Sequence, residues 1–249
     1  MSGNRRFIVS SRTIRDGYAS FDGELHHHMA RVLRLRSGDE VLLVDELGRR
    51  HQGEIDQVTQ EWTAVRIIQT LEAAKFPEAL GVTVIQGLPK GEKIELVLQK
   101  GTELGVSDFA IFRADRSVPK LSGDKLSGRL DRWSRIVQEA ARQSERFDQP
   151  TVAWHPSAAA AAASAANADL KLLLWERGVP CPLRDVLEGM PKPNRVAIAI
   201  GPEGGFEPGE AEAFELWGFT PVTLGERILR TETAALAMTA ILQYKWGDI

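Results

Sequence analysis

The chain has 249 residues, 43% of them apolar and 26% charged, with a formal net charge of −3, so it is long enough to bury a substantial core in one large domain or two smaller ones. Its single cysteine, Cys181, excludes an internal disulfide framework and a multi-cysteine zinc or iron–sulfur site. The sequence shows neither a secretory signal core nor an apolar run of about 18 residues, so we expect a soluble, cytoplasmic protein with no membrane partner.

The charges are unevenly distributed along the chain. Residues 1–36 contain seven arginines and three acidic residues, and residues 112–146 contain nine basic and five acidic residues. Residues 201–217 carry five glutamates and no basic residue. Basic patches of this kind suit a polyanion such as RNA, although scattered solvated arginines explain the charge pattern equally well.

Residues 1–72 are predicted to form a small β-barrel. Short runs rich in Val, Ile and Thr, separated by turn signals, indicate strands at 6–10, 40–46, 49–58 and 62–70. The stretch LHHHMARVLRL predicts a short helix with apolar positions at Leu25, Met29, Val32, Leu33 and Leu35. The three histidines at 26–28 lack the spacing of helical metal ligands, so we expect no metal and a solvated or RNA-facing helix end.

Residues 73–80 are predicted to be a linker, after which strands alternate with helices. Strands are expected at 81–89, 109–114, 170–176, 195–203 and 219–225, and helices at 90–106, 129–144 and 232–246. This alternation predicts a parallel sheet in an α/β domain spanning 81–249. The alanine-rich stretch 157–168 is expected to be a surface helix, because alanine has the highest helix propensity.

Two basic segments of this second domain are candidates for RNA contact. Lys90 follows the first strand, at the sheet edge where ligands of α/β proteins bind. The helix 129–144 and its continuation place Arg135, Arg142 and Arg146 roughly on one face. An ordinary turn and a solvated helix face are the alternative interpretations.

The segment IAIGPEGGFEPG (198–209) has the composition of a phosphate-binding loop but not its pattern. A Walker loop places lysine after its second glycine, where this chain has Phe206, and no G-x-G-x-x-G is present. Glu203 and Glu207 would repel a phosphate. We therefore expect a neutral or cationic ligand, approached closely by the glycine backbone, and a helix start stabilised by Glu207, Glu210 and Glu212.

The segment LGERILRTETAALAM (224–238) provides a second loop at a strand end. Thr231 is predicted to be the N-cap of the last helix, and Arg227 and Arg230 project from the loop before it. Two such loops predict a pocket for the adenine and sulfonium of a methyl donor, bound by backbone and apolar groups.

Together these motifs resemble the SPOUT methyltransferases and, more narrowly, the bacterial family that methylates N3 of uridine in 16S ribosomal RNA. The resemblance is carried by residues 26–41, 87–106, 116–120, 139–144, 200–206 and 224–238. It implies an N-terminal PUA-like β-barrel for RNA, a C-terminal α/β domain with a deep trefoil knot, S-adenosylmethionine as cofactor, and an active homodimer. The chain departs from the family pattern at Glu145, where a glycine is common.

The resemblance also implies a set of site residues. Arg230 would stabilise the anionic uracil, and Glu232 is a candidate base. The expected donor pocket comprises Leu174, Gly201, Glu203, Gly204, Leu224, Gly225, Ile228, Leu229, Arg230 and Thr233. RNA contacts are expected from Arg31, Arg34, Lys90, Arg116, Lys120, Arg135 and Arg142, and no metal is expected.

The implied reaction is methylation of N3 of one uridine in small-subunit ribosomal RNA, in the decoding region of the 30S subunit. Uracil N3 would attack the sulfonium methyl group directly, and S-adenosylhomocysteine would leave. The alternatives are a ribose 2′-O or other RNA methyltransferase of the same superfamily, and a non-catalytic RNA-binding module. A nucleotide-dependent kinase is disfavoured because both phosphate fingerprints are absent.

Overall fold

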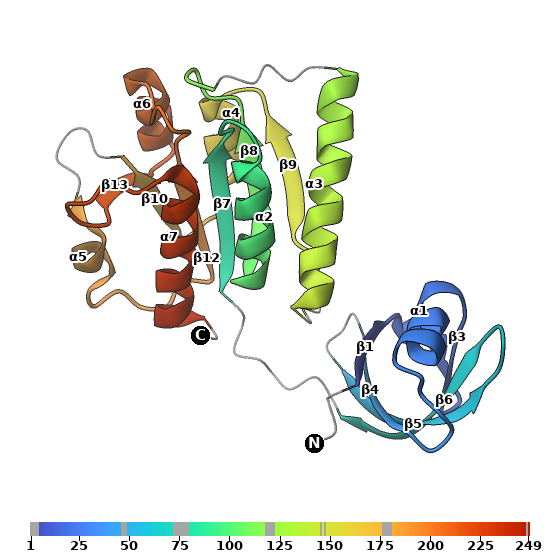
Figure 1. The fold of residues 1–249 in the computed structure, drawn as a ribbon. Helices are drawn as coiled ribbons and strands as arrows, with labels where there is room; N and C mark the ends of the chain where they lie inside the picture. Colours follow the sequence, from blue (N-terminus) through green and yellow to red (C-terminus); the bar gives the residue numbers. More distant parts are fainter. Residues whose placement is uncertain are drawn as a thin grey trace. The chain divides into compact units, whose positions relative to one another are not determined.

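The structure of the chain, a computed structural model, forms two compact units (Figure 1). It describes residues 5–45, 49–71, 80–117, 123–144, 146, 148–175, 181–247 and 249. The first unit consists of Met1–Pro77 with Glu145–Asp148, and the second of Glu78–Ser144 with Gln149–Ile249. Within the predicted linker 73–80, only Leu80 is described, and its side chain is buried in the core of the second unit.

The first unit is built on a six-stranded sheet in the order β1-β4-β5-β6-β3-β2. Its strands are β1 (Arg6–Val9), β2 (Ile14–Arg15), β3 (Tyr18–Phe21), β4 (Glu40–Asp45), β5 (Arg50–Val58) and β6 (Thr63–Leu71). The four predicted strands are confirmed. The prediction missed β2 and β3, because two and four residues are too few to show a clear alternation.

The predicted helix of the first unit is present but starts and ends earlier than expected, and its second half is a π-helix. It comprises α1 (Gly23–His27) followed by η2 (His28–Val32). Met29 and Leu35 are buried in the core of the unit, but Val32 and Leu33 are exposed, so the predicted apolar face is only partly right. Arg34, at the exit of the π-helix, has a φ of 52° and so adopts the left-handed conformation.

One of the three adjacent histidines is structural. His26 is 6% exposed, and its Nδ1 lies 2.8 Å from Thr63 Oγ1 while its Nε2 lies 3.2 Å from the Gln60 carbonyl oxygen. The expectation of a solvated or RNA-facing helix end is therefore wrong for His26, because both ring nitrogens are used to attach α1 to the sheet.

The second unit is built on a seven-stranded sheet in the order β11-β13-β10-β12-β7-β8-β9. Its strands are β7 (Gly81–Gly87), β8 (Val106–Phe112), β9 (Thr151–His155), β10 (Leu170–Leu174), β11 (Cys181–Pro182), β12 (Arg195–Ile200) and β13 (Thr220–Thr223). All of its strand pairs are parallel, which confirms the predicted sheet. The carboxyl ends of neighbouring strands therefore meet at one edge (Figure 1).

Helices cover both faces of this sheet. They are α2 (Lys93–Glu103), α3 (Asp124–Gln143), α4 (Ala158–Ser164), α5 (Leu183–Leu187), α6 (Pro208–Leu216) and α7 (Thr231–Trp246). The helices α2, α3, α5 and α7 share one core with the sheet, which includes Ile94, Trp133 and Met238. The opposite core, with Phe206 and Phe214, is covered by α4 and α6. In the described ranges, no helix is long and apolar enough to cross a membrane.

Two helices differ from their predictions. The alanine-rich α4 is not a surface helix, because Ala158, Ala161 and Ala162 are buried, and α4 packs against α6. The long helix α3 begins at Asp124, five residues before its predicted start, and ends at Gln143. Arg146 consequently lies beyond the helix and does not share its face with Arg135 and Arg142.

Two helical glycines give opposite predictions for stability. A Cβ on Gly101 of α2 would lie 2.9 Å from Phe109 Cε1, whereas a Cβ on Gly128 of α3 would meet nothing within 4 Å. We expect Gly101→Ala to destabilise the fold by about 1–3 kcal/mol through overpacking. Gly128→Ala should stabilise it by about 0.5–1 kcal/mol, because alanine loses less backbone entropy on folding. Urea unfolding measures the free energy of unfolding of both variants. Equal changes in the two variants would contradict the close packing of Gly101 against Phe109.

Candidate active site

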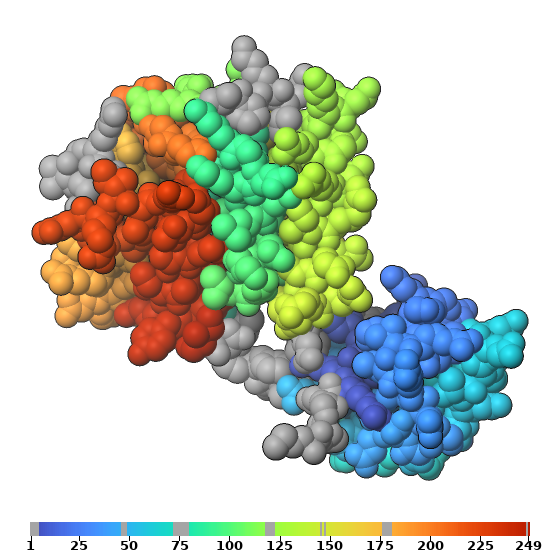
Figure 2. Space-filling view, in the orientation of Figure 1, coloured from blue at the N-terminus to red at the C-terminus, as the bar shows by residue number. Residues whose placement is uncertain are grey.

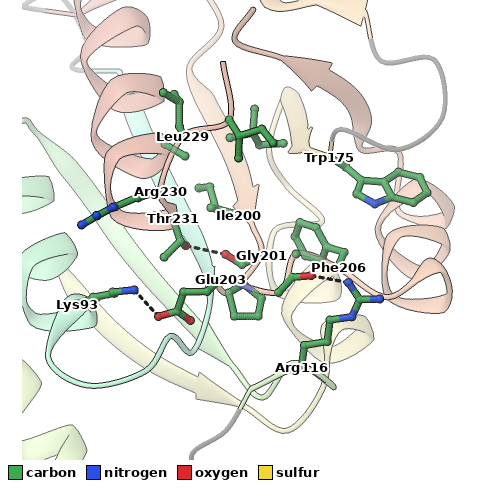
Figure 3. Close-up of a pocket in the computed structure, with 16 residues that line it drawn as sticks. Lys93, Arg116, Trp175, Ile200, Gly201, Glu203, Phe206, Leu229, Arg230 and Thr231 are labelled. Carbon is green, nitrogen blue, oxygen red and sulfur yellow. Dashed lines mark hydrogen bonds and ion pairs between the residues drawn. The ribbon is translucent and has the colours of Figure 1, made fainter. Parts of the chain in front are cut away.

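The carboxyl edge of the parallel sheet carries a cavity of about 710 Å³ (Figure 3). This volume is typical of sites for small molecules. Its walls come from the end of β10, the loop after β12, and the loop before α7 together with the start of that helix. The lining residues are Lys93, Arg116, Leu174, Trp175, Ile200, Gly201, Pro202, Glu203, Gly204, Gly205, Phe206, Ile228, Leu229, Arg230, Thr231 and Ala234.

The glycines of the first wall are required by the folding of the loop itself. A Cβ on Gly201 would lie 3.0 Å from the carbonyl carbon of Gly205 and 3.1 Å from the nitrogen of Phe206, which are backbone atoms and cannot rotate away. Gly205 has a φ of +70°, and its N–H donates to the Pro202 carbonyl at 2.9 Å. The sequence suggested that glycine serves close approach to a ligand, but here it first permits a tight turn.

The loop contains no basic residue, yet the fold brings two to it from distant parts of the chain. The ammonium of Lys93 lies 2.6 Å from Glu203 Oε1. Arg116 donates from Nε to Glu207 and from Nη1 to the Gly204 carbonyl, and Figure 3 shows its guanidinium beside the glycine loop. Each cation is paired with a carboxylate of the loop, so neither is available to a phosphate, in keeping with a ligand of another class.

Glu203 is held in place from two directions. Besides its ion pair with Lys93, its carboxylate accepts hydrogen bonds from the backbone N–H of Lys90 at 3.1 and 3.2 Å. Burial acts to raise the pKa of Glu203, but the hydrogen bonds from Lys93 and the backbone outweigh it and hold the pKa below its ordinary value. The carboxylate is therefore ionised at neutral pH and fixes the loop to the start of α2.

The helix after the loop begins as the sequence predicted. Glu207 is the N-cap of α6, and its backbone N–H donates to Glu210 Oε2 at 2.9 Å. The other carboxylate oxygen of Glu210 accepts the backbone N–H of Asp115, also at 2.9 Å. The predicted stabilisation of the helix start is confirmed for Glu207 and Glu210, and it also ties α6 to the segment after β8, but Glu212 lies beyond the first turn.

The second wall is joined to the first by Thr231. The prediction that Thr231 caps α7 is wrong, because Arg230 occupies the N-cap position and Thr231 is the first helical residue. The Thr231 hydroxyl instead donates to the Gly201 carbonyl at 2.6 Å (Figure 3), and it accepts from Gln86 Nε2 at 2.8 Å. A hydroxyl expected to serve its own helix thus connects the two loops of the cavity.

The structure brings most of the predicted donor-pocket residues together. Seven of the ten line the cavity: Leu174, Gly201, Glu203, Gly204, Ile228, Leu229 and Arg230. Leu224, Gly225 and Thr233 do not line it, and Leu224 packs against the core instead. Glu232, the candidate base, is also absent from the lining, and one of its carboxylate oxygens is buried without a partner among the described residues.

The predicted RNA contacts lie at several places. Arg31 and Arg34 are exposed in the first unit. In the second unit, Lys90 is exposed and Arg116 lines the cavity. On α3, Arg135 and Arg142 are exposed, and Arg142 is paired with Glu139 at 2.6 Å. Lys120 lies outside the described residues.

Several lining residues were missed by the sequence reading. Trp175 directly follows the predicted Leu174, and its Nε1 is buried with no partner among the described residues. Lys93 and Ala234 come from helix starts beside the predicted loops, but they were not included in the expected donor pocket. Apart from their positions next to strand ends, these residues carry no signal in the sequence.

The charges and surfaces of the cavity define what it is able to bind. Apolar walls formed by Leu174, Ile200 and Leu229 lie beside the exposed backbone of the glycine loop. Within the described part of the chain, Arg230 is the lining cation for which no carboxylate partner is found. Such a site suits a ligand with a flat apolar ring, and it leaves one guanidinium to act on a developing negative charge.

Comparison with known proteins identifies the family. A family model described as an RNA methyltransferase domain matches residues 77–243, and one described as an RNA methyltransferase PUA domain matches residues 21–59. The ribosomal RNA small subunit methyltransferase E of Bacillus subtilis is 33% identical over 231 residues, which cover 91% of this chain and 90% of the relative. The chain belongs to the ribosomal RNA small subunit methyltransferase E family.

The fold agrees with this family membership. A crystal structure of the ribosomal RNA small subunit methyltransferase E of Neisseria gonorrhoeae, bound to S-adenosyl methionine, superposes with a TM-score of 0.77 at 28% identity and covers 99% of this chain and 100% of that one. The PUA match falls in the first unit, and nearly all of the methyltransferase match falls in the second. The predicted PUA-like domain and α/β methyltransferase domain are confirmed, while the knot stays a prediction.

The ion pair at Glu203 can be tested without any ligand. Glu203→Gln keeps the shape of the side chain but removes the charge that Lys93 and the Lys90 N–H stabilise. We expect faster hydrogen–deuterium exchange in the loop after β12, with a change in unfolding free energy of less than about 1 kcal/mol, because the pair is partly exposed. Glu215→Gln, on the exposed side of α6, is the control. Equal exchange in the two variants would contradict the role of Glu203.

The ion pair between Glu203 and Lys93 also makes the stability of the loop after β12 depend on pH. The pKa of Glu203 is lower in the folded protein than in the unfolded chain. Its contribution to stability is therefore complete above the pKa that Glu203 has when unfolded, and it is lost as the pH falls through the pKa that Glu203 has when folded. Exchange protection of the loop should therefore be constant through the neutral range and decrease only below the ordinary pKa of a glutamate. A decrease that begins near neutral pH would exclude Glu203 as its cause.

Proposed function

We propose that this chain is an S-adenosylmethionine-dependent methyltransferase that methylates N3 of a uridine in small-subunit ribosomal RNA. Family membership supports the enzyme class and the substrate. The single structural observation that carries the proposal is the cavity formed by the two loops at the carboxyl edge of the parallel sheet. A cytoplasmic reaction in the decoding region of the 30S subunit, on naked RNA or on the subunit, is part of the same proposal.

The residues of the cavity fit S-adenosylmethionine. Leu174, Ile200 and Leu229 offer an apolar surface for adenine, and the glycine loop offers backbone groups that hydrogen-bond it. The pairing of Lys93 and Arg116 with glutamates matches a cofactor that carries no phosphate. When bound, S-adenosylmethionine supplies a methyl group made electrophilic by its positively charged sulfur.

The protein residues would prepare the uridine. The N3–H of uracil is weakly acidic, so negative charge develops on the base as the proton leaves. Arg230, exposed at the start of α7, is placed to stabilise this charge. Glu232 remains the candidate base, although its position in the first turn of α7 is equally suited to compensating the helix dipole.

The RNA is assigned to the predicted basic residues of both units. These are Arg31, Arg34, Lys90, Arg116, Lys120, Arg135 and Arg142. Phosphate contacts of this kind position a substrate without reading its sequence. Of these residues, Arg116 would act indirectly, through the glycine loop, because its guanidinium is already engaged by the carbonyl of Gly204 and the carboxylate of Glu207.

The active form in this proposal is a homodimer, and an exposed apolar face suggests where it forms. Ile241 and Tyr244 of α7, 39% and 79% exposed, are three residues apart and so share a helix face. Leu96 of the neighbouring helix α2 is 41% exposed. Figure 2 shows α7 in red beside α2 in green on one surface of the second unit. A second copy would cover these side chains.

Nucleoside mass spectrometry tests the reaction. Small-subunit RNA from a strain lacking the enzyme, incubated with the protein and S-adenosylmethionine, should gain N3-methyluridine. Arg230→Ala should reduce the rate by about 10²–10³-fold, the usual loss for a group that stabilises transition-state charge, while calorimetry shows that S-adenosylhomocysteine still binds.

Arg227→Ala is the matched control for Arg230. Arg227 is exposed in the same loop, three residues earlier, but does not line the cavity, so its variant should methylate normally. A ribose-methylated product would replace the proposed reaction with 2′-O methylation. If RNA bound but no methyl group were transferred, the non-catalytic alternative would be correct.

The dimer face gives a separate prediction. The double variant Ile241→Asp/Tyr244→Asp should be monomeric by light scattering, because two charges would be buried without partners in the interface. Leu216→Asp changes an 88% exposed leucine on α6 and should leave the dimer intact. A double variant with the mass of a dimer would place the interface elsewhere.

A further inference from the structure

A buried glutamine lies beneath the junction of the two cavity walls. Gln86 is in β7, where its neighbours Val82, Val84 and Ile85 are apolar, and it is only 1% exposed. It is in register with Ile200 of β12, the last residue of that strand. A polar side chain at this position needs an explanation, because burying an amide is unfavourable unless it is hydrogen-bonded.

The amide nitrogen of Gln86 binds groups from both walls. It lies 2.8 Å from Thr231 Oγ1 and 3.2 Å from the Gly201 carbonyl oxygen, and it also lies 2.9 Å from the carbonyl oxygen of its neighbour Gly87. The Thr231 hydroxyl uses its hydrogen on the Gly201 carbonyl at 2.6 Å, so its oxygen is free to accept from Gln86. The two hydrogens of the amide are shared among these acceptors, of which Thr231 is the nearest, and the Thr231 hydroxyl closes a ring of Gln86, Thr231 and Gly201.

Gln86 connects segments that are far apart in the sequence. Thr231 is 145 residues from Gln86, and Gly201 is 115 residues from it. Both Thr231 and Gly201 line the cavity, whereas Gln86 does not. Gly201 directly follows β12 and Thr231 begins α7, and both belong to walls that continue as loops, so the amide adds a side-chain link between the two walls from the neighbouring strand β7.

The oxygen atom of the same amide carries a cost in stability. Gln86 Oε1 is buried and has no hydrogen-bond partner among the described residues. A buried acceptor without a partner costs free energy, and an apolar side chain of the same shape would avoid that cost. The contacts made by Nε2 have to offset this cost, and they are the contacts that join the two walls.

We propose that Gln86 is a positioning residue that sets the distance between the two walls of the cavity, acting through Thr231 and Gly201. The geometry of this clamp is independent of the ligand, and only the identity of the ligand rests on the proposed function. The clamp preorganises the cavity, so that the donor does not have to order two loops when it binds.

The test compares two buried glutamines. Gln243 of α7 is 4% exposed, and its Nε2 donates to the Gly105 carbonyl at 3.1 Å, outside the cavity. Gln86→Leu should accelerate hydrogen–deuterium exchange in the loop after β12 and the loop before α7, and it should weaken S-adenosylhomocysteine about five- to tenfold by calorimetry. Gln243→Leu should leave both loops and the affinity unchanged.

Two further measurements distinguish positioning from general stability. In steady-state assays, Gln86→Leu should raise the KM for S-adenosylmethionine and leave the KM for RNA unchanged. Thr231→Val removes the hydroxyl from the same ring of hydrogen bonds. The double variant Gln86→Leu/Thr231→Val should therefore lose no more affinity for S-adenosylhomocysteine than the more damaging of the two single variants. Thr231→Val also provides the readout if Gln86→Leu does not fold.

The outcomes are distinct. Unchanged loop exchange in Gln86→Leu, unchanged affinity despite faster exchange, or additive losses in the double variant would each overturn the clamp. If the wild-type chain did not bind S-adenosylhomocysteine, the proposed function would fail, and loop exchange alone would then decide whether Gln86 joins the walls.

Discussion

The cavity depends on one constraint, the parallel direction of every strand in the second unit. Leu174 of β10, Ile200 of β12 and Gln86 of β7 form a continuous row across three neighbouring strands at the carboxyl edge. The chain leaves each strand just beyond this row, so the loops that follow begin side by side. The apolar members of the row face the ligand site, and the polar member lies behind it. Sheet register thereby determines which side chains form the base of the cavity before any loop is placed.

Much of the fold was predictable because it depends on local pattern. The strands at 195–200 and 220–223 and the helix after Arg230 follow from apolar runs and turn residues that act within a few positions. The ion pair of Lys93 with Glu203 was not predictable, because 110 residues separate its partners. Trp175 shows the same limit, since its burial depends on the loops of other strands. Local rules identify the strand ends, but only the assembled sheet decides which side chains meet there.

Thr231 shows how a local rule fails at a functional site. A threonine before a helical run predicts a cap, because its hydroxyl accepts a backbone N–H of the first turn. In the structure Thr231 lies one residue further in, where its hydroxyl reaches the carbonyl of Gly201 instead. That carbonyl belongs to a glycine whose Cβ would collide with the backbone of Gly205. The tight turn therefore exposes the acceptor, and the acceptor determines the role of the threonine. Neither half of this contact is informative in the sequence without the other.

The distribution of charge explains how a chain with a net charge of −3 is suited to RNA. Three of the five glutamates in the acidic segment 201–217 are engaged within the protein, with Glu203 on Lys93, Glu207 on Arg116 and Glu210 at the start of α6. Among the described residues, Arg31 and Arg34 have no carboxylate partner. Because paired carboxylates are largely neutralised at short range, the unpaired arginines dominate the local field that a polyanion meets. The net charge of the chain therefore says little about its partner, because the local field depends on which carboxylates are paired within the protein.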